Sequence, residues 1–172
     1  MKIELVRPTI ELKSQALDYR QEHFNHGEAI INGSELFDKT ENYEEWLTSV
    51  TNNANPETVS KDWVLTDTFF AVDQERNVII GIIDLRHELK GFLVDFGNTG
   101  YSVRPSERCK GYATEMLRQI KEVARQAGLH KLHLSVERDN FPSVKTIIGN
   151  GGKYERSFQY EGEYADIYEI EL

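Results

Sequence analysis

A hexapeptide near the middle of the chain carries the residues best suited to chemistry. Arg108-Cys109-Lys110-Gly111-Tyr112-Ala113 follows a β-rich segment that ends at Val103, and it opens a long helical pattern. The first N–H groups of a helix lack intrahelical acceptors, and the helix dipole adds partial positive charge there. Gly111 would let the backbone approach an anion closely, while Arg108 and Lys110 would add countercharge. The segment as far as Thr114 therefore predicts a phosphate-binding turn, with an ordinary helix start containing a glycine as the alternative.

Other residues suit proton transfer or metal binding less clearly. Four polar side chains near strand ends could border a cleft, although ordinary surface or hairpin positions are the simpler interpretation: His87, Glu88, Glu137 and Tyr154. The spacings His23-x-x-His26 and His130-x-x-His133 predict no metal site. The first pair lies at a helix end, the second spans a loop and a strand, and no carboxylate completes an obvious set.

Changes in hydrophobic period indicate the elements that must position these residues. In chain order the predicted elements are a strand at 2–7, helices at 8–24 and 42–50, strands at 66–73, 78–85 and 92–103, a helix at 113–127, a strand at 131–136, a helix at 140–150 and two strands within 154–172. This order predicts an α+β fold with a mixed, mostly antiparallel β-sheet flanked by helices on both faces.

Composition bounds the class of protein. A length of 172 residues, 39% hydrophobic and 28% charged, is typical of one globular domain over residues 1–172. The net charge of -9 argues against a nucleic-acid partner, because a polyanion would be repelled. No apolar run approaches the roughly 20 residues that cross a bilayer, and the acidic start does not resemble a secretion signal. A cytoplasmic protein without a membrane partner is expected.

The hexapeptide and its context resemble the GCN5-related N-acetyltransferase (GNAT) superfamily. The signature of that family is Arg or Gln, two residues, Gly, one residue, then Gly or Ala, and residues 108–113 fit it. One strand later, Asp139-Asn140-Phe141-Pro142-Ser143 looks like the Asn-x-x-Ala/Ser element of the family. The resemblance runs from about Thr66 to Gly152, whereas the first sixty residues match only in the coarse order of elements.

The resemblance implies a GNAT-like fold that uses acetyl-CoA as co-substrate, with no metal. Backbone amides of residues 108–114 would hold the CoA pyrophosphate, assisted by the side chains of Arg108 and Lys110. The strand from Tyr101 to Val103 would pair its backbone with the pantetheine arm. Asn140 and Ser143 would face the cofactor, although Asn140 equally suits a helix N-cap.

The implied reaction is direct attack of a primary amine of a small molecule on the thioester, in a ternary complex. A protein or peptide acetyltransferase, or an acyl-CoA-binding domain without transfer activity, are the alternatives. The strand before the loop lacks the Glu that many members carry, and Ile147 stands seven residues after the Asn, where many carry Tyr. Tyr160, Tyr164 and Tyr168 recur at a spacing that fits packing or a homodimer surface.

Overall fold

The computed structural model describes residues 2–172. In chain order the elements are β1 (Ile3–Val6), the short 3-10 helix η1 (Ile10–Leu12), α1 (Lys13–Asn25), α2 (Tyr43–Asn53), β2 (Thr66–Asp73), β3 (Val78–Arg86), α3 (Leu93–Phe96), β4 (Tyr101–Val103), η2 (Pro105–Glu107), α4 (Tyr112–Gln126), β5 (Lys131–Glu137), α5 (Phe141–Gly149), β6 (Lys153–Tyr160) and β7 (Glu163–Glu171). Within residues 2–172, no helix has the length and apolar character needed to cross a membrane.

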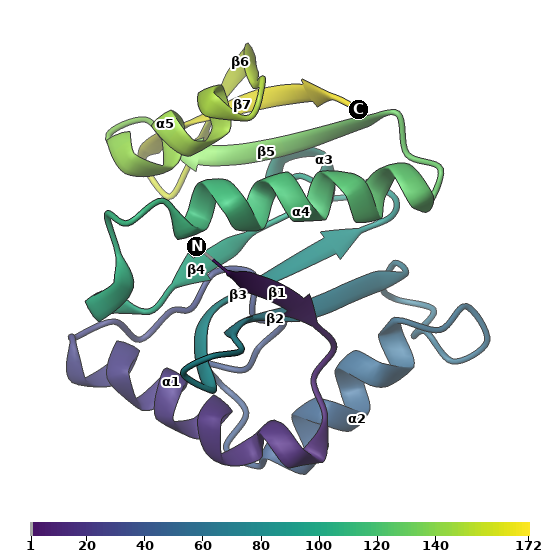
Figure 1. Ribbon diagram of the computed structural model, residues 1–172. Coiled ribbons are helices and arrows are strands. Elements are labelled where there is room, and N and C mark those ends of the chain that lie inside the picture. Colours follow the sequence, from purple (N-terminus) through teal and green to yellow (C-terminus); the bar gives the residue numbers. More distant parts are fainter. Residues whose placement is uncertain (1) are drawn as a thin grey trace.

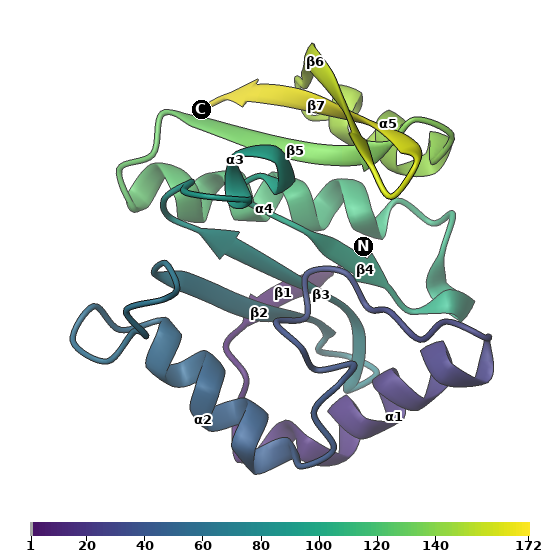
Figure 2. The same cartoon turned by 180° about the vertical axis from the view of Figure 1, so that it is seen from behind.

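The strands form two antiparallel sheets with α4 between them (Figure 1). The first has the order β1-β2-β3-β4, and the second has the order β5-β7-β6. Helices α1 and α2 cover the face of the first sheet that points away from α4, as the view from behind also shows (Figure 2). The predicted α+β fold, a mostly antiparallel sheet with helices on both faces, is therefore confirmed.

Alternation along β2 explains why both faces of the first sheet are covered. Phe70 and Val72 point to one side and pack with the buried rings of α1 and α2, including Tyr19 and Trp46. The neighbouring residues point to the other side and join the core around α4, because successive side chains of a strand face opposite ways. β2 is thus buried on both faces from Thr66 to Val72, although its first three residues are polar.

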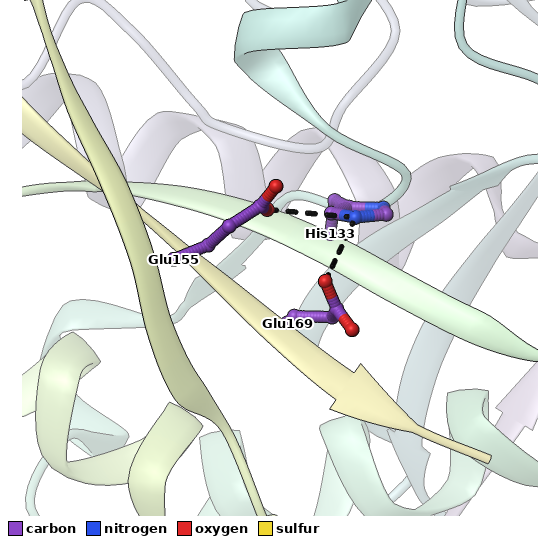
Figure 3. Close-up of side chains that lie close together, drawn as sticks. All are labelled: His133, Glu155 and Glu169. Carbon is purple, nitrogen blue, oxygen red and sulfur yellow. Dashed lines mark ion pairs between the residues drawn. The ribbon is translucent and has the colours of Figure 1, made fainter.

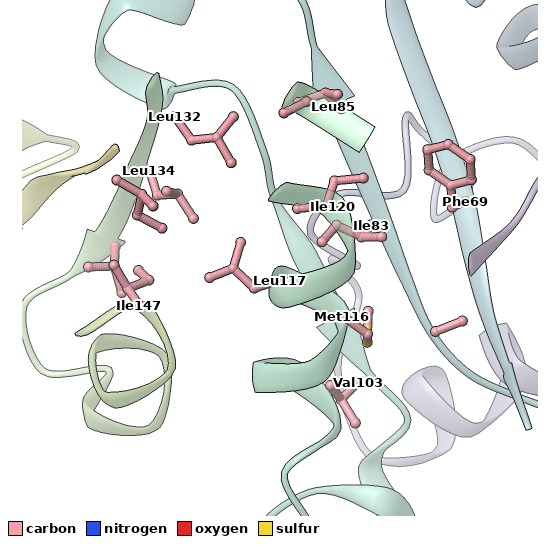
Figure 4. Packing of buried hydrophobic residues seen from close by; sticks show 14 of the residues in the cluster. Phe69, Ile83, Leu85, Val103, Met116, Leu117, Ile120, Leu132, Leu134 and Ile147 are labelled. Atoms are coloured by element: carbon pink, nitrogen blue, oxygen red, sulfur yellow. The ribbon is translucent and has the colours of Figure 1, made fainter. Parts of the chain in front are cut away.

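Helix α4 joins the two sheets through its apolar stripe. Met116, Leu117 and Ile120 are fully buried between strand residues such as Ile83 on one side and Leu134 on the other (Figure 4). This stripe is the one that the sequence predicts for 113–127. Burial of several large aliphatic side chains, each contributing about 1.5–3 kcal/mol, holds the first turn of α4 in a fixed place.

The predicted strand over 92–103 is wrong in its first half. Residues Leu93–Phe96 form the single turn α3, and only Tyr101–Val103 is strand. The cause is tertiary: the ring of Phe96 packs edge-to-face on Phe158 and Tyr160, and Gly97 leaves the turn with a φ of 88°.

The three tyrosines of the predicted stripe do not share one surface. Tyr160 ends β6, whereas the other two belong to β7, on the far side of the hairpin turn. Tyr164 is exposed, and Tyr168 is buried in the core around α4. Packing therefore explains Tyr168. The three tyrosines do not form a continuous stripe that could support the predicted homodimer surface.

Candidate active site

A cleft of about 1320 Å³ opens where β4 and β5 separate. Its walls come from β4, the turn before α4, the end of β5, the first turns of α5 and the β6–β7 hairpin. Within residues 2–172, no ladder pairs β4 with β5, and an isolated bridge between Gly97 and Leu134 joins the two sheets at one end. The cleft is the space that this separation leaves.

Strand β4 presents to the cleft a backbone edge that no other strand of residues 2–172 pairs, although Val103 O accepts from Arg108 Nε at 3.2 Å. The N–H of Arg104 donates to Ile80 O at 2.7 Å, and Gly100 O accepts from Asp84 N at 3.1 Å. Since backbone groups alternate sides along a strand, those of Tyr101 and Val103 point away from β3 and toward the cleft. Both residues lie where the sequence predicts a strand that could pair with an extended ligand.

Buried polar contacts fix the turn that leads into α4. The guanidinium of Arg104, which is only 7% exposed, donates to Ile79 O at 2.8 Å and to Glu22 Oε2 at 2.6 Å. The other oxygen of Glu22 accepts from the N–H of Ser106 at 2.8 Å. Helix α1 therefore anchors the start of the turn, although the sequence of the turn gives no sign of this partner.

The first turn of α4 offers a row of free backbone donors. Cys109 and Gly111 both adopt left-handed conformations, with φ of 63° and 86°. Within residues 2–172, the N–H groups of Cys109 through Thr114 have no hydrogen-bond acceptor, and most of these residues line the cleft. Successive free N–H groups at a helix N-terminus are suited to binding an anion, and phosphate binding by this turn stays a prediction.

The basic side chains of this turn are held by carboxylates. Both terminal nitrogens of Arg108 donate to Glu28, each at 2.7 Å, and Lys110 Nζ donates to Glu107 Oε2 at 3.0 Å. Hydrogen bonds from Arg108, aided by His23, hold the pKa of Glu28 at about 2 although partial burial opposes this. An anion would therefore meet these two cations already paired, which the local sequence did not predict.

Asn140 and Ser143 lie on the α5 side of the cleft. The Oδ1 of Asn140 accepts from Ser143 N at 3.4 Å, so Asn140 caps α5, one of the two roles that the sequence suggested. Ser143 Oγ lies 2.6 Å from the hydroxyl of Tyr101 and thereby links α5 to β4. Contact of either residue with a cofactor stays a prediction.

Substitutions at Asn140 separate its cap from a cofactor contact. Asn140→Ala removes the acceptor of the cap and is expected to lower the free energy of unfolding by about 1 kcal/mol. Asn140→Asp keeps an acceptor oxygen, so urea denaturation should show near wild-type stability; equal loss in both variants would contradict the cap. Weaker acetyl-CoA binding by the stable Asp variant, measured by calorimetry, would show that the amide N–H₂ contacts the cofactor.

The structure brings one of the four candidate proton carriers into the cleft. Glu137 lines it at the end of β5. His87 instead pairs with Asp67 at 2.7 Å, Glu88 faces Lys90 at 3.5 Å, and the hydroxyl of Tyr154 lies 2.7 Å from Ser157 Oγ. None of these three lines the cleft, which corrects the expectation that they border it. Proximity to a strand end does not specify which end of the sheet a residue occupies.

Asp84 and the partly exposed Glu35 form an acidic pair beside the cleft that the sequence does not predict. Asp84 on β3 is fully buried, and its Oδ1 accepts from Gly100 N at 2.7 Å. Arg86, which lines the cleft, lies 3.1 Å from Asp84 Oδ2 and 3.8 Å from Glu35 Oε1. Burial, together with the neighbouring Asp84, raises the pKa of Glu35 to about 9. A carboxylate inside the apolar run of β3 was the available signal, because buried charges need partners.

The raised pKa of Glu35 predicts a pH-dependent stability. Because the folded pKa lies above the unfolded value, the unfolded state ionises first, and stability is lost as the pH rises from about 4.5 to about 9. This group should lower the free energy of unfolding by at most about 1.4 kcal/mol per pH unit in that window. Urea denaturation at pH 6 and pH 9 should show a smaller fall for Glu35→Gln than for wild type or for the exposed control Glu41→Gln. Parallel falls in all three proteins would refute the assignment.

The structure separates the two histidines of the spacing His130-x-x-His133. Two carboxylates, Glu155 and Glu169, approach His133 from neighbouring strands (Figure 3). His130 lies outside this group, so the carboxylates accompany one histidine of the spacing and not the pair. Glu155 and Glu169 lie far from His133 along the chain, so spacing within one segment could not reveal them.

Comparison with known proteins places this geometry in a family. The model of the acetyltransferase (GNAT) family matches residues 36–147, which include β4, the turn and α4. The comparison with curated proteins gave no significant match.

Solved structures share the fold at low sequence identity. RimJ of Mycobacterium smegmatis, in complex with CoA-disulfide, has a TM-score of 0.75 at 15% identity, over 99% of this chain and 82% of that one. YncA of Salmonella typhimurium, with its cofactor acetyl-CoA, has a TM-score of 0.69 at 13% identity, over 99% and 94%. Ribosomal-protein-S5-alanine acetyltransferase of Vibrio fischeri has a TM-score of 0.68 at 16% identity, over 98% and 91%.

The family match covers well over half of the chain, and the shared fold agrees with it. The free amides at the start of α4 and the open edge of β4 both lie in or beside the matched segment. The chain therefore belongs to the acetyltransferase (GNAT) family of acyltransferases.

Proposed function

We propose that this enzyme transfers an acetyl group from acetyl-CoA to a primary amine of a small molecule. The observation that carries the proposal is the row of free N–H groups from Cys109 to Thr114 at one end of the cleft. A pyrophosphate bound there would leave the pantetheine arm to run along the open edge of β4, beside Tyr101 and Val103. Asn140 and Ser143 would flank the arm from α5.

The chemistry would take place where the arm ends, deeper between the two sheets. The amine nitrogen attacks the thioester carbonyl, the C–S bond breaks, and CoA leaves as a thiolate. Backbone N–H groups of β4 would stabilise the oxyanion of the tetrahedral intermediate. Glu137 is our candidate for taking the proton of the amine, directly or through water, because it lines the cleft.

A peptide N-terminus or a lysine side chain is the second candidate acceptor. The structural neighbour from Vibrio fischeri is named for the acetylation of a ribosomal protein, which favours this reading.

The test of the proposed function combines binding with turnover. Calorimetry should show acetyl-CoA binding to the purified enzyme, and release of free CoA thiol should follow on addition of an amine from a panel of small amines and peptides. Turnover with peptides alone would favour the second candidate. Binding without turnover on any amine would indicate an acyl-CoA-binding domain, and the absence of any binding would refute the proposal.

Because Arg108 is paired with Glu28, variants of both residues can test whether the Arg108 guanidinium helps to bind the pyrophosphate. If Arg108 turns to the pyrophosphate, Arg108→Ala should weaken acetyl-CoA binding about tenfold, the value of one charge-assisted hydrogen bond. Glu28→Gln should strengthen binding severalfold, because it weakens the bidentate pair that holds Arg108 away. Calorimetry checks both; weaker binding in Glu28→Gln would mean that the pair instead braces the turn.

A further inference from the structure

Three strands of the second sheet bring together three side chains of the types that can bind metal ions. His133 on β5 and Glu169 on β7 are direct partners in the register of the sheet, and Glu155 lies on β6 at the register shift between its neighbours. Leu132 and Leu134 point into the core, so His133 points to the opposite face, away from α4. Figure 3 shows the two carboxylates converging on the imidazole ring.

The spacing of the donors matches the coordination shell of a small ion. His133 Nε2 lies 3.5 Å from Glu155 Oε2 and 3.5 Å from Glu169 Oε2, and the three donors lie within 4.8 Å of one another. These gaps are long for hydrogen bonds. Ligands at about 2.0–2.1 Å from a tetrahedral ion are about 3.4 Å apart, which is close to the gaps around His133.

The surroundings orient the donors and leave room for a fourth ligand. Lys131 Nζ donates to Glu169 Oε1 at 2.5 Å, so Oε2 is left to face His133. The backbone of His133 is held by Asn98, whose Oδ1 accepts from His133 N at 2.8 Å. Glu155 and Glu169, though not His133, also line a surface hollow of about 260 Å³ that is open to solvent water. Two carboxylates would balance the charge of a divalent ion, although the ammonium of Lys131 opposes it.

We propose that His133, Glu155 and Glu169 form a binding site for a divalent transition-metal ion, with water as the fourth ligand. An imidazole nitrogen beside two carboxylates suits Zn²⁺ better than the oxygen-preferring Mg²⁺ or Ca²⁺. The ion would tie the edge strand β6 to β5 and β7. The site lies apart from the acetyl-CoA cleft, so the proposal does not depend on the proposed function.

Calorimetry with ZnCl₂ on chelator-treated, tag-free protein tests the proposal. One equivalent of Zn²⁺ should bind, and Zn²⁺ at about a hundredfold excess over its Kd should raise the melting temperature by about 5–10 °C. Mg²⁺ at the same concentration should leave the melting temperature unchanged. Absence of stoichiometric Zn²⁺ binding would overturn the proposal.

Variants show whether these residues hold the ion. His133→Gln and Glu155→Gln should each weaken Zn²⁺ binding at least tenfold, whereas His130→Gln, an exposed histidine outside the cluster, should bind as wild type does. Unchanged binding in both cluster variants would mean that the ion sits elsewhere and would refute the site. Glu155 is exposed, so Glu155→Gln keeps the test valid if His133→Gln fails to fold.

Discussion

Gly111→Val is expected to lower the affinity for acetyl-CoA at least a hundredfold while the protein stays folded. Gly111 has a φ of 86°, a conformation that a β-branched residue adopts only with strain. The valine side chain would also stand at the first turn of α4, among the N–H groups proposed to hold the pyrophosphate. Calorimetry with acetyl-CoA measures the loss.

Gly128 provides a matched control at the other end of α4. Its φ is 88°, and a side chain there would meet nothing within 4 Å. Gly128→Val should therefore suffer a similar backbone cost, about 1–2 kcal/mol, and still bind acetyl-CoA normally. If both variants lose binding equally, general destabilisation explains the effect. If neither loses it, the pyrophosphate lies elsewhere.

Gly97→Ala is expected to destabilise the protein and to weaken acetyl-CoA binding together. A Cβ at Gly97 would lie 2.2 Å from the carbonyl oxygen of His133, and the φ of 88° disfavours any side chain. The backbone cannot yield freely, because Gly97 bridges to Leu134 and its carbonyl accepts from Arg86 at 2.8 Å. We expect a loss of about 3 kcal/mol in the free energy of unfolding, measured by urea denaturation.

The effect on binding follows from the position of Gly97 at the junction of the sheets. The bridge sets where β4 leaves β5, and a shift there would move the open edge of β4 that lines the cleft. Gly91→Ala is the control, since Gly91 precedes α3 with a φ of 59° and open space around its Cβ position. Equal stability of the two variants would contradict the steric argument.

The sequence by itself determined most of the elements and the position of the turn that opens α4. Hydrophobic period depends on neighbours two to four residues apart, so the buried stripe of α4 and the hairpin of β2 and β3 could be read locally. The free amides of Gly111 to Thr114 also follow from local structure, because any helix start leaves its first four N–H groups unpaired. Family resemblance at residues 108–113 then pointed to the fold and the acyltransferase class.

Only the tertiary structure decided which side chains meet. Arg108 pairs with Glu28, 80 residues away in sequence, so the cation predicted for phosphate is already bound by a carboxylate. The turn at Leu93–Phe96 replaces the expected strand because Phe96 packs on the distant β6. Glu35 with Asp84, and His133 with Glu155 and Glu169, come together through sheet register and loop placement. Such contacts depend on how the elements pack against one another. The spacing of residues within one segment does not indicate which distant side chains will meet.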